Sequence, residues 1–351
     1  MQPPRLLFQA HNRRGLGHLM RGLNLARAVR QLAPDAAILF YTRSSSTEAL
    51  CGDAFRYFIE PDPDGTAHWP EVMRSFAPDV TIYDTLLPPG AAHETASAGA
   101  RSVYIMRKMK ADRQPEIFAN PALACVDLIL IPHTPAEFGY ALPTALARKG
   151  AFVGPIVRLP DRAAQDRLRA KYGIGPADFV LTSTVGGGGF TEQAESFFAT
   201  VYEVHRRVSG RLPHLRHLVI QGPNFRRRLC PLPGMTVIEY EPELINLLAI
   251  SDLVIAEGGY NTVNEIRVAK TPAVFLPSVR NLDDQEERVR ALERQGLAAV
   301  CADGDAATTA RQVAEICLSP TWPHAVRQRY AMDRMELGNR AAAERIVGLV
   351  R

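Results

Sequence analysis

Several hallmarks of other protein classes are missing from this sequence. No run approaches the ~18 consecutive apolar residues that a transmembrane helix needs. The N-terminal stretch MQPPRLLFQAHNRRG has no signal-peptide pattern, so we expect a cytoplasmic protein. The five cysteines are scattered, without the CxxC or Cys/His spacing of a metal site. They favour free thiols and argue against a structural zinc ion.

An excess of one charge is also missing. The 41 basic and 37 acidic residues leave a net charge of +4, which does not indicate a nucleic-acid-binding protein. Local basic groups at residues 107–113 (RKMKADR) and 226–228 (RRR) carry no interleaved aromatic residues. They are either solvated loops or a means of attracting an anionic ligand. The sequence is compatible with membrane association but does not indicate it.

Short apolar bursts alternate with helical patterns along the whole chain. They are RLLFQA, AAILFYT, FRYFI, DVTIYD, RSVYIM and VDLILI in the first half, and FVLTSTV, LRHLVIQ, MTVIEY, SDLVIA and TPAVFLP in the second. Several are continuously apolar, as strands buried on both faces of a parallel sheet are. Helical patterns, such as 18–32 and 191–208, lie between them. The alternation predicts an α/β protein with two Rossmann-like, doubly wound parallel-sheet domains.

The segment GPIVRLPDR (154–162) contains two prolines and a glycine and predicts a linker. We therefore expect one domain over residues 1–155, a second over 156–325, and a terminal helical segment over 326–351. Ligands of open parallel sheets bind beyond the carboxyl ends of the strands, where the strand order reverses. The loops that follow the strands are thus the places to look for a site, in a cleft that both domains line.

The loop HNRRGLGH follows the first predicted strand and opens a helix at His18. Such a helix start presents backbone N–H groups and a positive dipole end, which suit an anion. The third glycine of the dinucleotide fingerprint is missing, so the motif is a weak indication of NAD. The dipole should lower the pKa of His18 and favour its neutral, proton-accepting form. The alternative is a histidine that only caps or packs.

Two further glycine-rich stretches lie in the second half. TVGGGGF (184–190) has four consecutive glycines, which cost unfolded-chain entropy and favour close approach of a phosphate or a base. It is not a Walker loop. In EGGYNTVNE (257–265), Thr262 and Glu265 match a capping box. Glu265 could instead accept two hydrogen bonds from a ribose diol, while Gly258 and Gly259 admit a diphosphate.

Amide and carboxylate side chains cluster after the last long apolar burst. The segment NLDDQEERV (281–289) places Asn281, Asp283, Asp284 and Gln285 there. Such groups offer the directional donors and acceptors that sugar hydroxyls need. The alternative is that Asp283 or Asp284 merely caps a helix.

The stretches RGLGHLMRGLNLARAV, VGGGG, EGGYNTVNE and LDDQ, in this order and at this spacing, resemble glycosyltransferase family 28. That family has the GT-B fold and includes the bacterial lipid II N-acetylglucosaminyltransferase. GGYNTVNEI followed by KTPAVFLPSVRNLDDQEERVRALERQGL is most similar to a bacterial branch known only as predicted glycosyltransferases. The resemblance covers most of the chain and is stronger in the second half.

The resemblance implies a role for each motif. Glu265 is expected to hold the ribose hydroxyls of a nucleotide-sugar. The other donor contacts implied are Gly258, Gly259, Tyr260, Asn261 and Thr262 at the diphosphate, Asp284 and Gln285 at the sugar, the backbone near Tyr240 and Glu241 at the base, and Gly17, Gly187 and Gly188 near the donor. Two departures concern phosphate neutralisation. The first loop has fewer glycines than is usual in the family, and Glu257 stands where the lipid II enzyme carries a basic residue.

We therefore expect transfer of a sugar from a UDP-sugar resembling UDP-GlcNAc, with a dTDP- or GDP-sugar as the alternative donor. The acceptor would bind mainly to the first domain, where His18 would deprotonate its hydroxyl and Asp84, at the end of DVTIYD, is a second candidate base. The resemblance implies no metal and no cofactor, with the helix dipole stabilising the leaving diphosphate. It also implies a terminal helix that returns to the first domain.

Three alternatives remain at this point. GHLMR also resembles a UDP-sugar hydrolase of the pseudaminic acid pathway, in which a histidine activates water. A nonhydrolysing 2-epimerase shares the fold. A binding module that senses a nucleotide-sugar without chemistry is the third.

Overall fold

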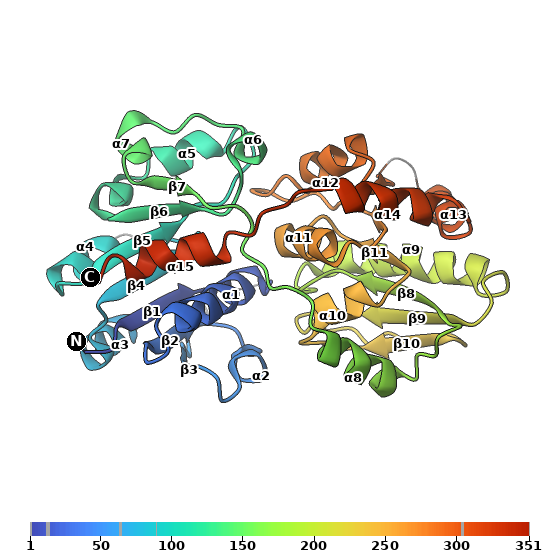
Figure 1. Ribbon diagram of the computed structural model, residues 1–351, viewed down its shortest axis with the longest axis horizontal. Helices are drawn as coiled ribbons and strands as arrows, with labels where there is room; N and C mark the ends of the chain where they lie inside the picture. The colour runs from blue at the N-terminus through green and yellow to red at the C-terminus, as the bar shows by residue number, and fades with distance from the viewer. Residues whose placement is uncertain (1, 12–14, 63–64, 89, 303–304, 351) are drawn as a thin grey trace. The chain divides into compact units, whose positions relative to one another are not determined.

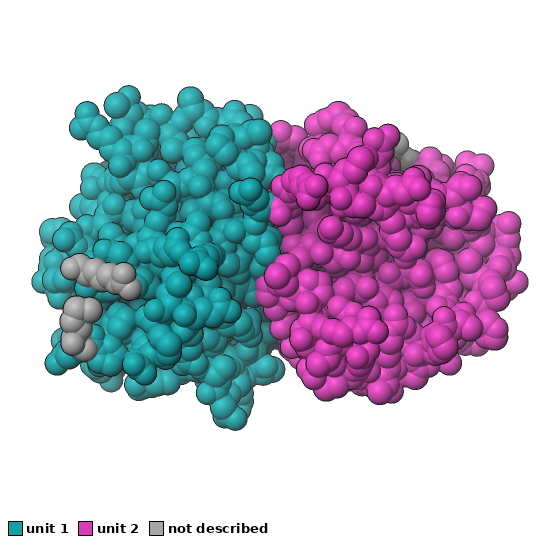
Figure 2. Space-filling view, viewed as in Figure 1, with its two compact units in different colours: residues 1–157, 336–351 teal, residues 158–335 magenta. Residues whose placement is uncertain are grey.

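The computed structural model describes residues 2–11, 15–62, 65–88, 90–302 and 305–350 (Figure 1). These residues form two compact units (Figure 2). The first unit comprises Met1–Val157 and Glu336–Arg351, and the second Arg158–Met335. Each unit is built on its own parallel sheet, which confirms the predicted pair of Rossmann-like folds.

The sheet of the first unit has the strand order β3-β2-β1-β4-β5-β6-β7. Its strands are β1 (Arg5–Ala10), β2 (Ala37–Thr42), β3 (Arg56–Ile59), β4 (Val80–Asp84), β5 (Arg101–Ile105), β6 (Leu128–Ile131) and β7 (Gly150–Phe152). The helices are α1 (Gly17–Leu32), α2 (Thr47–Cys51), α3 (Trp69–Phe76), α4 (Ala91–Ser97), α5 (Gln114–Phe118), α6 (Pro135–Phe138), α7 (Thr144–Ala147) and α15 (Asn339–Val347), with the 3-10 helix η1 (Pro121–Cys125). The strand order reverses between β1 and β4.

The sheet of the second unit has the order β10-β9-β8-β11-β12-β13, which reverses between β8 and β11. Its strands are β8 (Phe179–Thr184), β9 (Leu215–Ile220), β10 (Met235–Ile238), β11 (Leu253–Ala256), β12 (Ala273–Phe275) and β13 (Ala299–Val300). The helices are α8 (Arg162–Tyr172), α9 (Thr191–Val208), α10 (Leu244–Ala249), α11 (Tyr260–Ala269), α12 (Gln285–Arg294), α13 (Ala306–Cys317) and α14 (Trp322–Met332).

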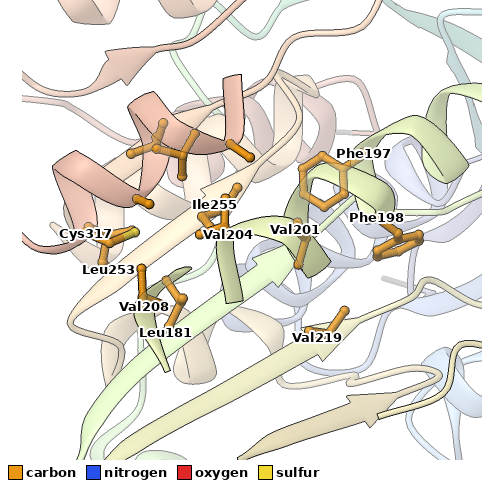
Figure 3. Close-up of a cluster of buried hydrophobic side chains, with 14 of the residues drawn as sticks. Leu181, Phe197, Phe198, Val201, Val204, Val208, Val219, Leu253, Ile255 and Cys317 are labelled. Atoms are coloured by element: carbon orange, nitrogen blue, oxygen red, sulfur yellow. The ribbon is translucent and has the colours of Figure 1, made fainter. Parts of the chain in front are cut away.

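Alternate residues of each central strand point to opposite faces, and each face receives its own helices. In the second unit, Leu253 and Ile255 of β11 pack with α9 and α13 (Figure 3). Helix α9 presents Phe197, Val201, Val204 and Val208 to this cluster, at the spacing of one helical face. The intervening residues of β11 pack with α11 and α12 on the other face. The predicted continuous apolar strands are thus buried on both sides.

The predicted terminal segment 326–351 is divided between the units. Helix α14 belongs to the second unit, whereas α15 packs on α1 in the first, which confirms the expected return of the chain. Between the helices, the Gly338 backbone N–H donates to the carbonyl of Pro155 at 2.7 Å. A Cβ at Gly338 would lie 2.4 Å from the Gly154 carbonyl oxygen. This close backbone contact accompanies the non-helical stretch that joins the helices.

No helix among the described residues is long and apolar enough to cross a membrane. All five cysteines are free thiols. Cys51, Cys301 and Cys317 are buried, whereas Cys125 and Cys230 are exposed.

A buried chain of polar groups joins α9 to the sheet of the second unit. Ser183 Oγ lies 2.8 Å from His217 Nε2, His217 Nδ1 lies 3.0 Å from His205 Nδ1, and His205 Nε2 lies 3.0 Å from the Pro233 carbonyl oxygen. These contacts are satisfied when both rings are neutral, with Ser183 donating to His217 and His205 donating to the carbonyl. Burial lowers the pKa of His217 to about 3 and also lowers the pKa of His205.

These buried, neutral histidines predict that the protein loses stability in acid. The pKa of His217 is lower in the folded state than the ~6.5 of an unfolded histidine, so the unfolded state binds more protons below that pH. The free energy of unfolding should therefore fall by up to about 1.4 kcal/mol per pH unit, from pH ~6.5 towards 3, for this group alone. In urea titrations between pH 6.5 and 4.5, His217→Gln should show a shallower fall than the wild type. The exposed His214, changed to Asn, is the control; equal slopes for wild type and His217→Gln would contradict the prediction.

Candidate functional site

In the first unit, the candidate catalytic residues meet where the strand order reverses. His18 is the second residue of α1, and Asp84 is the last residue of β4. Their Nδ1 and Oδ1 atoms lie 2.8 Å apart. Residues 12–14 of the predicted loop lie outside the described residues. The structure thus brings together two side chains that are 66 positions apart in the sequence.

Asp84 is buried and surrounded by donors. Arg21, itself buried, donates through Nε to Oδ2 at 2.9 Å and through Nη2 to Oδ1. The Thr85 hydroxyl donates at 2.9 Å. Burial alone would raise the pKa of Asp84, but the charge of Arg21 and the contact with His18 outweigh burial and lower it. Asp84 therefore stays ionised, an environment that suits orienting His18 better than accepting a proton.

His18 is poised in its neutral form. Burial lowers its pKa more than Asp84 raises it, and the nearby charges of Arg21 and Arg107 lower it further. Because the Asp84 carboxylate can only accept, Nδ1 of the neutral ring carries the proton. Nε2 then has a free lone pair, which can accept a proton from a substrate hydroxyl. The side chain is 18% exposed, enough for a ligand to contact it.

In the second unit, glycines of the predicted loop are required by packing. Gly188 has a φ of +73°, and a Cβ there would lie 2.7 Å from the Gln221 carbonyl oxygen. Gly222 has a φ of +84°, and a Cβ there would lie 2.5 Å from the Gly186 carbonyl oxygen. The loops after β8 and β9 thus pack backbone against backbone. Packing therefore accounts for Gly188 without a ligand, and Gly222 was not predicted.

Packing requires a glycine at position 258 but not at position 259. A Cβ on Gly258 would lie 2.9 Å from Val289 Cγ1 and 3.0 Å from Gln285, so this residue is a glycine because α12 packs on it. Its N–H donates to Gln285 Oε1 at 3.1 Å, and its carbonyl accepts from Arg288 at 2.6 Å. Gly259 is the N-cap of α11 at a φ of −60°, and a Cβ on it would have its nearest neighbour 3.9 Å away. A methyl group would therefore fit at Gly259 without displacing any described residue.

The capping-box interpretation of Thr262 and Glu265 is wrong. Helix α11 begins at Tyr260, so Thr262 is already its third residue and Glu265 lies in the second turn. Glu265 is 7% exposed, and no described residue donates a hydrogen bond to its carboxylate. Burial raises its pKa to about 7, although the charge of Arg158 opposes the shift. An almost buried carboxylate without a donor is costly unless a ligand supplies one.

A second polar atom without a partner lies near Glu265. The Tyr240 hydroxyl, which follows β10, is buried without a hydrogen-bond partner among the described residues. Burial raises the pKa of Tyr240, and the charges of Arg158 and Glu265 both reach it. Its neighbour Glu241 is fully committed: the carboxylate accepts from Lys171, Tyr172 and the Glu243 N–H. The Tyr240 hydroxyl can therefore still form a hydrogen bond, whereas the Glu241 carboxylate already has its partners.

The predicted sugar-binding residues have structural partners. Asp284 is the N-cap of α12 and accepts from the Glu287 N–H at 3.0 Å, as the alternative interpretation expected. Gln285 is buried and accepts from the N–H groups of Gly258 and Ser278. Asp283 pairs with Arg288.

Sequence analysis did not identify three side chains of this region, namely Phe190, Arg280 and Arg288. Arg280 pairs with Glu257 and stacks on Phe190, and Arg288 contacts the Gly258 carbonyl. No local pattern marks Arg280, because its partners Glu257 and Phe190 lie on other loops of the sheet edge.

Comparison with protein families matches the model of the "Glycosyltransferase family 28 C-terminal domain" over residues 184–336. A UDP-N-acetylglucosamine–N-acetylmuramyl-(pentapeptide) pyrophosphoryl-undecaprenol N-acetylglucosamine transferase of Desulfitobacterium hafniense (strain Y51) is 33% identical over 329 residues, 82% of this chain and 84% of the relative. The enzyme of the same name from Symbiobacterium thermophilum is 24% identical and covers 95% of this chain and 94% of its own length.

Solved structures share the fold at low sequence identity. The spinosyn forosaminyltransferase SpnP superposes with a TM-score of 0.66 at 14% identity and covers 99% of this chain and 100% of its own. UGT89C1 of Arabidopsis thaliana, complexed with UDP, superposes with a TM-score of 0.65 at 14% identity and the same coverage. These likenesses confirm the predicted architecture.

The two adjacent glycines predict opposite outcomes on mutation to alanine. Gly258→Ala should force α12 away from β11 and lower the free energy of unfolding by about 1–3 kcal/mol. Gly259→Ala adopts an allowed backbone conformation with no close contact at its Cβ, and should change the free energy of unfolding by less than ~1 kcal/mol. Thermal melts of the two variants without ligand measure this difference, and equal losses would contradict the packing described for Gly258.

Proposed function

Since this chain belongs to glycosyltransferase family 28, it is a glycosyltransferase, and we propose that its donor is a UDP-sugar of the UDP-N-acetylglucosamine type. The names of the relatives include this donor. They are named as transferases, which favours transfer over the hydrolase, epimerase and binding-module alternatives. We place the nucleotide in the second unit and the acceptor beside His18 in the first.

The buried, unpartnered carboxylate of Glu265 carries the proposal. The 2′- and 3′-hydroxyls of a ribose are two adjacent donors, and a carboxylate accepts both with its two oxygens. Each hydrogen bond to a charged acceptor contributes about 1.5–3 kcal/mol. The Tyr240 hydroxyl is also buried and has no described partner. It lies near enough to Glu265 to feel its charge, and is available to the same nucleoside. Binding of a nucleoside would thus satisfy polar groups that the described residues leave open.

We place the diphosphate at the start of α11. Gly259 leaves room there, and the first turn of α11 contains no acidic residue to oppose an anion. The N-terminal N–H groups and the helix dipole stabilise negative charge on the leaving UDP. On this basis we predict that the transfer needs no metal ion.

The contact between His18 and Asp84 supports the following transfer step. Nε2 of neutral His18 accepts the proton of the acceptor hydroxyl as its oxygen bonds to the anomeric carbon. The bond from that carbon to the diphosphate breaks, and UDP leaves with the electron pair. Asp84 holds the Nδ1 proton and stabilises the imidazolium that forms, so it is a positioning residue.

We propose that the acceptor carries an anionic group. Arg107 and Lys108 follow β5 on the sheet edge that carries Asp84, and both are half-buried rather than solvated. The charge of Arg107 reaches His18. The pyrophosphoryl-undecaprenol in the names of the relatives is an acceptor of this chemistry.

Glu265→Gln separates a ribose-binding role from a structural one. The amide retains the shape of the side chain, so the melting temperature should stay within a few degrees of the wild type. UDP affinity, measured by calorimetry, should fall about 10- to 100-fold, because one acceptor oxygen and the charge are lost. ADP should bind the wild type more weakly than UDP does. Unchanged UDP affinity in the variant would exclude Glu265 from the site.

The raised pKa of Glu265 predicts that nucleoside affinity depends on pH. With a pKa of about 7, the carboxylate of the free protein becomes protonated as the pH falls, and the protonated form accepts the diol less well. Wild-type affinity for uridine, which carries no titrating phosphate, should therefore fall by up to about tenfold per pH unit below 7. Glu265→Gln should show no such slope.

His18→Ala should lower kcat at least ~10²-fold while leaving the affinity for UDP unchanged, because His18 acts on the acceptor. Asp84→Asn should also lower kcat, since an amide can hold the wrong tautomer of His18. Rates are measured as UDP release from UDP-N-acetylglucosamine with an acceptor panel. A near-wild-type rate in both variants would remove this pair from the mechanism.

A further inference from the structure

An arginine and a glutamate form a buried pair at the switch point of the second sheet. Arg280 lies in the loop between β12 and α12, and its Nη2 donates to Glu257 Oε2 at 2.7 Å. The guanidinium carbon lies 3.7 Å from the centre of the Phe190 ring, which follows the four glycines. The side chains of Arg280 and Glu257 are 9% and 6% exposed. Loops after β8, β11 and β12 thus converge on one guanidinium.

The pair leaves part of the arginine unsatisfied. Nη1 of Arg280 is buried, and no described residue offers it a hydrogen-bond acceptor. A buried donor of a charged group costs more to leave unpaired than a neutral one. A guanidinium stacked on an aromatic ring keeps its N–H edge for acceptors with two adjacent oxygens, such as phosphate. The geometry therefore requires an acceptor that the described residues do not provide.

The position of the pair identifies the acceptor. Glu257 directly precedes Gly258 and Gly259, so Arg280 is held next to the start of α11. The neighbouring Arg288 is committed to Asp283 and to the Gly258 carbonyl. Arg280 is thus a cation with open hydrogen-bonding capacity beside a helix N-terminus that attracts anions.

We propose that Arg280 binds the diphosphate of the donor nucleotide, held in position by Glu257 and Phe190; this rests on the proposed UDP-sugar donor. Glu257 fixes the guanidinium through Nη2 and leaves Nη1 for a phosphate oxygen. The acidic residue at position 257 is then the support of a cation supplied by another loop. The alternative is that Arg280 only neutralises Glu257, in which case phosphate recognition would not depend on it.

Comparing uridine with UDP isolates the contribution of the diphosphate. We expect the wild type to bind UDP more tightly than uridine in calorimetry. Arg280→Met keeps the stem on Phe190 and removes the charge, so UDP affinity should fall about 10- to 100-fold while uridine affinity is unchanged. The control is Arg267→Met, which removes a similarly buried, ion-paired arginine from the last turn of α11. It should change neither affinity.

Glu257→Gln keeps the inference testable if Arg280→Met does not fold. The amide still accepts from Nη2 but no longer opposes an anion, so UDP affinity should rise severalfold with uridine affinity unchanged. An unchanged ratio of UDP to uridine affinity in either variant would show that Arg280 only neutralises Glu257. A wild type that binds neither uridine nor UDP would instead overturn the proposed donor, and this inference with it.

Discussion

The reversal of strand order in each parallel sheet is the constraint on which both candidate sites depend. In the first unit, Gly22 of α1 lies against Phe8 and Phe40, whereas α4 packs with Leu7 and Tyr83 on the opposite face. The two helices that follow β1 and β4 therefore lie on opposite faces of the sheet, and ligands of open parallel sheets bind beyond the carboxyl ends of strands arranged in this way. Helices α9 and α11 diverge from β8 and β11 in the same manner. His18 and Asp84 occupy one of these positions, and Gly259 and Glu257 occupy the other.

Each unit holds a buried carboxylate, and the two carboxylates differ in their hydrogen bonds. Asp84 receives hydrogen bonds from Arg21, Thr85 and His18, which lower its pKa and fix it as an anion. Glu265 receives none from the described residues, and its pKa is raised to about 7. A satisfied carboxylate orients a neighbour, whereas an unsatisfied one is stabilised by a ligand. This difference in hydrogen bonding supports different roles for the two residues in one transfer reaction.

Continuous apolar bursts were sufficient to predict most strands, because strands buried on both faces admit few polar residues. The helix over residues 191–208 was predicted with its observed bounds. β7 and β13, of three and two residues, were not predicted. The terminal segment was predicted as helical throughout, whereas residues 333–338 between α14 and α15 are not helical. The contacts of Gly338 with the backbone of residues 153–155 could not be read from the sequence.

The candidate site was predictable where one motif carries it and not where distant loops meet. His18 was predicted from a helix start and Asp84 from a strand end, whereas Glu265, in the second turn of α11, was singled out within the motif EGGYNTVNE. The reason for Gly258 lies in Val289, and that for Gly188 lies in Gln221 and Phe225, so the sequence alone assigned these glycines to a ligand. Arg280 could not be identified from the sequence, because its contacts are with Glu257 and Phe190, which are 23 and 90 residues away.

We propose that the Glu265 carboxylate receives no hydrogen bond from the described residues because it binds the ribose of the donor nucleotide. The most direct measurement compares the affinities of UDP and 2′-deoxy-UDP for the wild type and for Glu265→Gln. We expect the wild type to prefer UDP by about tenfold or more, the equivalent of one hydrogen bond to a charged group, and this preference to largely disappear in the variant. Equal affinities for the two nucleotides in the wild type, or the same preference in both proteins, would contradict it.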